Sequence, residues 1–245
     1  QGYNAALAAV AVSDSPTGPF RFVAAFRPNA GQWPANVPEE MRSVPEPDRV
    51  QETSSEAPNP EARQQNILGR DLEGGQMSRD QTLFVDDDGS AYHLTASEEN
   101  STLHISRLTD DYLAPSGDYV RVFERRWMEA PAVCKRQGTY YFIGSGCTGW
   151  APNAARSAVA DSPFGPWTEL ENPCVGINPG NGLGPEKTFG AQSTYILKVE
   201  GRDDLYIAIF DIWCPKDAID GRYVWLPMHF SEGGFTIEWQ DEWGV

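Results

Sequence analysis

The 245-residue sequence predicts an all-β protein built as a β-propeller. Strand-like segments come in sets of four at intervals of about 50–60 residues, and no segment shows a helical periodicity. In addition, one strand–turn–strand sequence occurs twice along the chain. A Greek-key sandwich is the alternative architecture, but it does not account for the repeated turn.

The repeated sequence joins two strands through Asp-Ser-Pro-x-Gly-Pro and an aromatic residue. It is AVSDSPTGPFRF at 11–22 and AVADSPFGPWTEL at 158–170. Pro and Gly supply the backbone dihedrals of a tight turn, so each copy predicts a strand, a turn and a second strand. The first copy lies between strands at 7–14 and 20–26, which by the repeat are the last two strands of a blade.

Three full sets of four strands follow, each rich in β-branched and aromatic residues between turn residues. Their expected strands are 81–86, 91–97, 102–108 and 119–123; then 130–136, 139–145, 156–161 and 166–170; then 193–199, 204–211, 222–230 and 235–239. The sequence thus predicts about three and a half blades. Because a propeller closes on itself, we expect the chain to be an N-terminally incomplete fragment of a single propeller domain, 1–245.

Residues 28–79 interrupt this pattern between the half blade and the first full blade. The segment contains seven prolines, many acidic residues and little apolar periodicity. It is therefore expected to be a long loop or insertion within the domain.

Composition excludes several classes of partner. A formal charge of −16 argues against nucleic acid and anionic membrane surfaces, which need a basic face, and suits a neutral ligand such as a sugar. No apolar run is long enough to span a membrane, and no signal peptide is visible. Four scattered cysteines make zinc improbable, and they leave open a disulfide such as Cys147–Cys174 or free buried thiols.

Three polar residues stand where the first strand of a blade begins: Asp80, Glu129 and Gln192. In propellers the innermost strands start at the central funnel, so these side chains are expected to converge there. The alternative is that the two acids are solvated turn residues.

The motifs around these residues resemble glycoside hydrolase family 43, especially its exo-β-1,3-galactanase branch. They are SRDQTLFVDDDGSAYHLTASEENSTLHISRLTDDYL, EAPAVCKRQGTYYFIGSGCTGWAPN, GAQSTYIL and DGRYVWLP, and the resemblance covers nearly the whole chain outside 28–79. It implies a five-bladed propeller, with the N-terminal blade and half of the second missing here. It also implies that the active site lies at the funnel.

By this resemblance Glu129 is the general acid and Asp80 the residue that tunes its pKa. The family's aspartate base lies on the first blade, which is absent here, and in the galactanase-like branch a glutamine matching Gln192 is proposed to activate water. Cleavage needs a protonated carboxyl on the leaving oxygen and, for inversion, a water on the opposite face. A negative charge on Asp80 would raise the pKa of Glu129, whereas an amide orients water better than it accepts a proton.

Loop residues near these positions are candidates for sugar contacts. The expected substrate-binding residues are Trp150, Thr148, Asn153, Trp213 and Glu98. Trp150 fits packing between blades equally well, and Glu98 also fits a solvated acid at a turn. Some family members hold a calcium ion, but no ligand motif here indicates one, so no metal or other cofactor is expected.

The resemblance therefore implies an inverting, exo-acting hydrolase of β-1,3-linked galactan in arabinogalactan side chains. An α-L-arabinofuranosidase, a β-galactofuranosidase and a non-catalytic carbohydrate-binding propeller are the alternatives. The expected partner is a plant-type polysaccharide or oligosaccharide, not nucleic acid or a membrane. A secreted, periplasmic or cell-surface location is expected, and the oligomeric state stays open.

Overall fold

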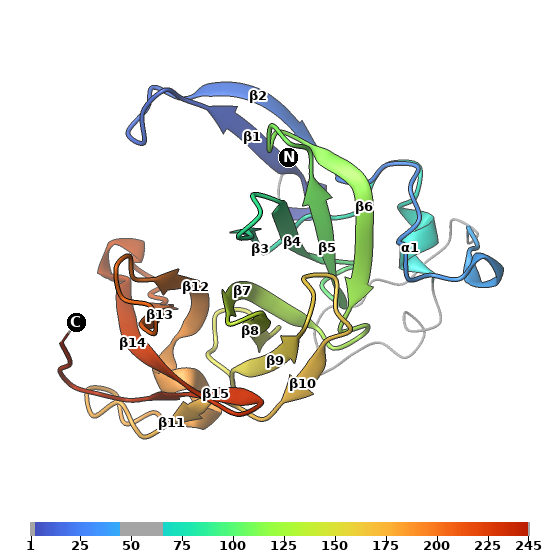
Figure 1. The fold of residues 1–245 in the computed structure, drawn as a ribbon. Coiled ribbons are helices and arrows are strands. Elements are labelled where there is room, and N and C mark those ends of the chain that lie inside the picture. Colours follow the sequence, from blue (N-terminus) through green and yellow to red (C-terminus); the bar gives the residue numbers. More distant parts are fainter. Residues whose placement is uncertain (1–2, 45–65, 245) are drawn as a thin grey trace. The chain divides into compact units, whose positions relative to one another are not determined.

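The computed structural model describes residues 3–44 and 66–244, and it confirms an all-β chain (Figure 1). The described residues form two compact units, one of residues 3–44 with 66–125 and the other of residues 126–244. Within these ranges no helix combines the length and the apolar character that a membrane crossing needs.

The first unit contains a hairpin and a four-stranded antiparallel sheet. The hairpin strands are β1 (Ala8–Val12) and β2 (Arg21–Phe26), and the sheet strands are β3 (Gln81–Val85), β4 (Ala91–Ser97), β5 (Thr102–Leu108) and β6 (Pro115–Val122). The sheet follows chain order, as the predicted set of four requires. Only β6 differs clearly from its prediction, because it starts earlier, at Pro115.

The second unit contains two sheets, shown from green to red in Figure 1. The first has β7 (Met128–Arg136), β8 (Thr139–Gly146), β9 (Arg156–Ala160) and β10 (Thr168–Leu170). The second has β12 (Gln192–Lys198), β13 (Tyr206–Ile212), β14 (Arg222–Ser231), β15 (Gly234–Glu238) and, parallel to β15, the short β11 (Cys174–Val175). The prediction missed β11, because two residues carry no readable alternation.

The two copies of the repeated turn have the same backbone geometry. Gly18 and Gly165 adopt φ values of +84° and +83°, and each precedes a cis proline. Only glycine takes up this region freely, which explains why the motif requires Gly at that place. The turns join β1 to β2 and β9 to β10 as antiparallel pairs, which confirms the predicted strand–turn–strand unit.

A hydrophobic core holds the two sheets of the second unit together. Ile143 from β8, Phe210 from β13 and Leu226 from β14 belong to one cluster and are at most 1% exposed. Burying each such side chain contributes about 1.5–3 kcal/mol. The hydroxyl of Tyr206 also donates to the backbone oxygen of Lys135 over 2.8 Å, so the β12–β15 sheet is fixed against β7.

The described parts of segment 28–79 are mainly loop, and residues 45–65 of the predicted insertion lie outside the described residues. The segment also contains a 3₁₀ turn at Glu39–Met41 and helix α1 (Ile67–Arg70). Ile67 and Leu68 are each 3% exposed, so this end of the segment is packed into its unit. Further 3₁₀ turns are Tyr3–Ala5, Pro185–Gly190 and Ala218–Asp220.

The four cysteines are free thiols, so the structure contains no Cys147–Cys174 disulfide. Cys134, Cys147 and Cys174 are buried, and Cys214 is half-buried. Burial raises the pKa of the Cys134 thiol and raises that of Cys174 to about 12. Buried thiols of this kind behave as small apolar side chains.

Candidate active site

The three residues predicted at strand starts do stand where strands begin. Asp80 directly precedes β3, Glu129 is the second residue of β7, and Gln192 is the first residue of β12. Glu129 and Gln192 belong to the second compact unit, where they meet. Asp80 belongs to the first unit, where its backbone oxygen accepts a 2.8 Å hydrogen bond from the amide of Ala96.

A β-bulge sets the position of Glu129. The pairing of β7 with β8 shifts by one residue between Glu129 and Ala132, and Ala130 adopts φ +52° in front of Pro131. A non-glycine residue in this region is uncommon, and bulges of this type redirect the neighbouring side chains. The shift places Glu129 opposite Ser145, with the glutamate only 9% exposed.

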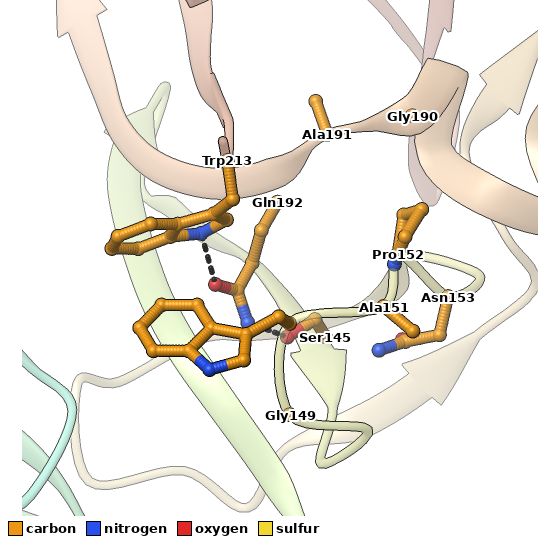
Figure 2. Close-up of a pocket in the computed structure, with 10 residues that line it drawn as sticks. Ser145, Gly149, Ala151, Pro152, Asn153, Gly190, Ala191, Gln192 and Trp213 are labelled. Atoms are coloured by element: carbon orange, nitrogen blue, oxygen red, sulfur yellow. Dashed lines mark hydrogen bonds between the residues drawn. The ribbon is translucent and has the colours of Figure 1, made fainter. Parts of the chain in front are cut away.

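The amide of Gln192 links three side chains of the second unit. Its Nε2 donates to Oε1 of Glu129 over 3.2 Å and to Oγ of Ser145 over 2.8 Å. Its Oε1 accepts a 3.2 Å hydrogen bond from the indole Nε1 of Trp213. Figure 2 shows the Gln192 side chain between Trp213 and Ser145.

Gln192 is brought to this place by an unusual turn. Thr188, Phe189 and Gly190 have consecutive positive φ values of 47°, 62° and 87°. Phe189 is fully buried, and its backbone oxygen accepts hydrogen bonds from the amide side chains of Asn178 and Asn181. These contacts offset the cost of left-handed backbone at two non-glycine residues.

Two further contacts connect this turn and β12 to the elements around Glu129. Oγ1 of Thr188 donates to the backbone oxygen of Asn153 over 2.6 Å. Oγ of Ser193 donates to the backbone oxygen of Ala130 over 2.7 Å, at the bulge itself. Hydrogen bonds on both sides of Gln192 therefore connect its backbone to other elements, on one side to Asn153 and on the other to Ala130, next to Glu129.

A small pocket with a volume of about 40 Å³ lies beside Gln192 and opens to solvent (Figure 2). Its lining residues are Ser145, Gly149, Trp150, Ala151, Pro152, Asn153, Gly190, Ala191, Gln192 and Trp213. Trp150 and Trp213 are 64% and 50% exposed, and their rings meet edge to face with centroids 5.0 Å apart. Exposed tryptophan beside hydrogen-bonding groups is suited to a sugar ring, which has both apolar C–H faces and hydroxyls.

Thr148 and Asn153, both predicted to bind sugar, hold the loop in shape. Nδ2 of Asn153 donates to the Gly146 oxygen and to Oγ1 of Thr148, each over 2.8 Å, and its Oδ1 accepts from the Gly146 amide. Oγ1 of Thr148 donates in turn to the oxygen of Ala151. Both side chains therefore position the Trp150 loop, and their contact with sugar stays a prediction.

Glu98 is neither solvated nor at the pocket, which corrects the interpretation of it as a solvated turn acid. The residue is 5% exposed, and its carboxylate accepts hydrogen bonds from Arg121 and His104. Burial opposes ionisation, but the hydrogen bonds from His104 and Arg121 outweigh it and lower the pKa of Glu98 to about 2. Both oxygens are engaged inside the first unit, so a direct sugar contact by Glu98 finds no support in this arrangement.

Two residues near the amide were not predicted from the sequence. Ser145 follows an ordinary strand pattern, and its place opposite Glu129 depends on the bulge. Asp211 pairs with Gln192 across β12 and β13, and burial raises the pKa of its carboxyl against a hydrogen bond from Thr194. An acid inside an apolar strand, as in YIAIFDIW, was a signal that could have drawn attention to Asp211.

Across residues 3–44 and 66–244, no group of three or more His, Cys, Asp or Glu side chains is arranged to hold a metal ion.

Comparison with known proteins finds similarity to glycoside hydrolases by family model, by sequence and by structure. The model of glycosyl hydrolases family 43 matches residues 56–187. A curated relative, β-D-galactofuranosidase xynD of Aspergillus niger, is 28% identical over 182 residues, which cover 71% of this chain and 51% of the relative. The chain thus spans about half the length of that curated relative.

Two solved structures align over nearly the whole chain. A family 43 β-1,3-galactosidase with galactodeoxynojirimycin is 45% identical with a TM-score of 0.88, over 100% of this chain and 70% of that one. An exo-β-1,3-galactanase from Clostridium thermocellum is 30% identical with a TM-score of 0.71, over 96% of this chain and 43% of that one.

Proposed function

The chain belongs to glycosyl hydrolases family 43, and on this basis we propose that it is an inverting, exo-acting hydrolase of β-1,3-linked galactan. In this proposal Glu129 is the general acid, Gln192 orients the attacking water, and Asp80 tunes the pKa of the acid. The observation that carries it is the 3.2 Å contact between Gln192 and Glu129 beside a pocket rimmed by two exposed tryptophans.

The reaction requires a proton donor, Glu129, and a group that positions water, Gln192. Glu129 transfers its proton to the glycosidic oxygen as the bond to the anomeric carbon breaks, and water attacks that carbon from the opposite face. Gln192 holds this water through its carbonyl oxygen, and because an amide is hardly basic in water, the proton that the attacking water loses passes to solvent water. The low exposure of Glu129 suits the acid role, since burial favours the neutral carboxyl.

The names of related structures support the choice of substrate. The solved relatives include β-1,3-galactosidases and exo-β-1,3-galactanases, one of them from Phanerochaete chrysosporium solved with β-1,3-galactotriose. Arabinogalactan side chains in the plant cell wall are therefore the proposed polysaccharide, and export from the cell follows from a substrate of this size. A β-propeller architecture for residues 1–245 as one catalytic domain, with 28–79 as an insertion within it, is part of the same proposal.

The test is galactose release from β-1,3-galactotriose by the wild type and Glu129→Gln. Proton NMR of the first minutes should show α-galactose from the wild type, as inversion requires, and galactobiose as the shortened product of exo-cleavage. Glu129→Gln should lose about 10²–10⁴-fold in turnover. Glu171→Gln, the same change at an exposed acid of the same unit, is the matched control. Full activity of Glu129→Gln, or β-galactose as the first product, would contradict the proposal.

A β-D-galactofuranosidase activity is the second candidate, because the curated relative bears that name. It is distinguished by comparing kcat/KM on p-nitrophenyl β-D-galactofuranoside and β-D-galactopyranoside, with the α-L-arabinofuranoside as a third substrate. Preference for a furanoside would favour this candidate. Sugar binding without turnover on every substrate would instead favour the carbohydrate-binding alternative.

A further inference from the structure

One hydrogen-bond partner of Gln192, the indole of Trp213, can donate a hydrogen bond but cannot accept one. Indole Nε1 of Trp213 carries a hydrogen and has no lone pair to offer, so it can only donate. Its 3.2 Å contact with Gln192 therefore identifies the amide atom facing it as the carbonyl oxygen. The opposite end of the amide, which faces Glu129 and Ser145, is then the N–H₂ group.

The other two partners do not select an orientation. The hydroxyl of Ser145 donates or accepts, so it can pair with either end of the amide. Glu129 accepts from N–H₂ when it is ionised and donates to a carbonyl when it is protonated. Trp213 is thus the one partner of this amide, among the described residues, whose chemistry forbids the flipped arrangement.

We propose that Trp213 is a positioning residue that controls the protonation of Glu129 through the orientation of the Gln192 amide. The inference rests on the proposed function, in which Glu129 is the general acid. With Trp213 in place, the N–H₂ group donates to Glu129, and a hydrogen bond of this kind favours the ionised carboxylate. Without the indole N–H, the amide can flip, and its carbonyl then favours the protonated carboxyl.

The consequence for activity has a definite sign. A general acid works only while it is protonated, so activity falls as pH rises through its pKa. Loss of the indole N–H should raise that pKa and extend activity to higher pH. The alkaline limb, which is the pH range over which activity falls as pH rises, should move upward by on the order of one pH unit in a variant without the indole N–H. At pH values above the wild-type limb, such a variant should retain about tenfold more of its maximal rate than the wild type does.

Other charged groups near Glu129 are carried by several elements of the second unit. Toward the pocket end, these are Arg126, Cys147, Arg156 and Asp211. Arg156 donates to the backbone oxygens of Arg126 and Trp127, directly before β7, and Cys147 contacts that same Trp127 oxygen. β7 and β8 also carry Cys134, Lys135, Arg136, Tyr140 and Tyr141, all toward the opposite end of the hairpin.

None of these groups is removed when Trp213 is changed, so each acts equally in the wild type and in the variant. Asp211 needs a control of its own, because it lies two residues from Trp213 and pairs with Gln192 across β12 and β13. If the displaced limb came from Asp211, it should disappear in an Asp211→Asn background.

The experiment compares the pH dependence of kcat/KM for Trp213→Phe and the wild type on a β-1,3-galacto-oligosaccharide. Trp213→Phe keeps an aromatic ring and removes the N–H, and its alkaline limb should lie about one unit higher. Trp150→Phe, the matched change at the other tryptophan of the pocket, should keep the wild-type limb even where KM changes. In a Gln192→Ala background Trp213→Phe should cause no further shift of the limb, because the amide that links Trp213 to Glu129 is already absent.

The outcomes separate this inference from the proposed function. If Glu129→Gln keeps its activity, the proposed function fails. If Glu129→Gln is inactive while Trp213→Phe has the wild-type limb, the inference alone is overturned. If Trp213→Phe turns over too slowly for kinetics, the ¹³C chemical shift of the Glu129 carboxyl reports its titration directly, with the signal assigned by its loss in Glu129→Gln. Equal titration midpoints of Glu129 in the wild type and in Trp213→Phe would also overturn the inference.

Discussion

Glu129 and Gln192 are 63 positions apart in the sequence, yet Nε2 of the amide donates to Oε1 of the carboxyl over 3.2 Å. The contact exists because β7 and β12 start side by side, and Ser193 fixes this arrangement by donating to the oxygen of Ala130. Both N–H bonds of the amide are used by Glu129 and Ser145. The carbonyl oxygen, which has a second lone pair beside its bond to Trp213, is the atom left to hold water.

Gln192→Glu should move the alkaline limb of kcat/KM to higher pH. The change places two carboxyls about 3 Å apart, and at that distance like charges cannot both ionise, so the pair holds one proton to higher pH. The limb should rise by one unit or more, as measured on β-1,3-galactobiose. Gln192→Ala, which adds no charge, is the control, and a limb in the glutamate variant that matches the alanine variant would contradict the contact.

Trp150→Ala should weaken substrate binding with little effect on the chemical step. The ring is 64% exposed at the pocket, where it can stack on a sugar, and loss of this apolar contact should raise KM about tenfold. The value of kcat should stay within about twofold, because binding of this type acts on substrate and transition state alike. Ile219→Ala, at an apolar side chain 92% exposed and outside the pocket lining, is the control. A fall in kcat with unchanged KM would assign Trp150 to the transition state instead.

The strand sets could be predicted because each strand has its own local pattern. Alternation within QTLFVDDDGSAYHL, for example, indicates β3, a turn and β4 without knowledge of any distant residue. The repeated turn was predictable for the same reason, since Gly165 and Pro166 determine the turn by themselves.

The site depends on register and on contacts between distant residues, which such patterns do not contain. An unshifted β7–β8 hairpin would place Gly146, not Ser145, opposite Glu129, and the bulge at Ala130 decides between them. The Trp213–Gln192 hydrogen bond joins the residue after β13 to the start of β12 through side chains whose rotamers no pattern specifies. The position of Glu129 and Gln192 at strand starts was therefore predictable, and the partners of their polar atoms were not.

Glu98→Gln should destabilise the protein strongly, although a solvated turn acid was one interpretation of the sequence. Its carboxylate is buried against Arg121 and His104, so removing the charge leaves a mostly buried guanidinium with only the exposed Glu124, among the described residues, as its ion-pair partner. Breaking a buried pair of this kind costs about 3–5 kcal/mol in the free energy of unfolding, measured by urea denaturation.

Glu124→Gln is the matched control for this prediction. Glu124 also pairs with Arg121, at 2.9 Å, but its side chain is 54% exposed. An exposed pair contributes at most about 1 kcal/mol, so this variant should be close to wild type. Equal losses in the two variants would show that burial does not decide the strength of these pairs.

His93 should make the protein less stable as pH falls below neutrality. The imidazole is 6% exposed, its Nε2 contacts Oε1 of Gln81 at 2.6 Å, and burial lowers its pKa to about 4. In the unfolded chain its pKa is about 6.5, so between these two values the unfolded state binds a proton that the folded state does not. Stability that is fully present above pH 6.5 is therefore lost as pH falls toward 4, by up to about 3 kcal/mol.

Urea unfolding at pH 7 and pH 5 measures this effect. Over that interval the wild type should lose about 2 kcal/mol more than His93→Gln, whose side chain does not titrate. The lowered pKa of Glu98, about 2, places its own loss of stability below about pH 4.5, so the two contributions do not overlap in this interval. His229→Gln, at an exposed histidine, should retain the wild-type pH dependence. If His93→Gln and the wild type lose stability in parallel from pH 7 to pH 5, the buried imidazole is not the group that titrates.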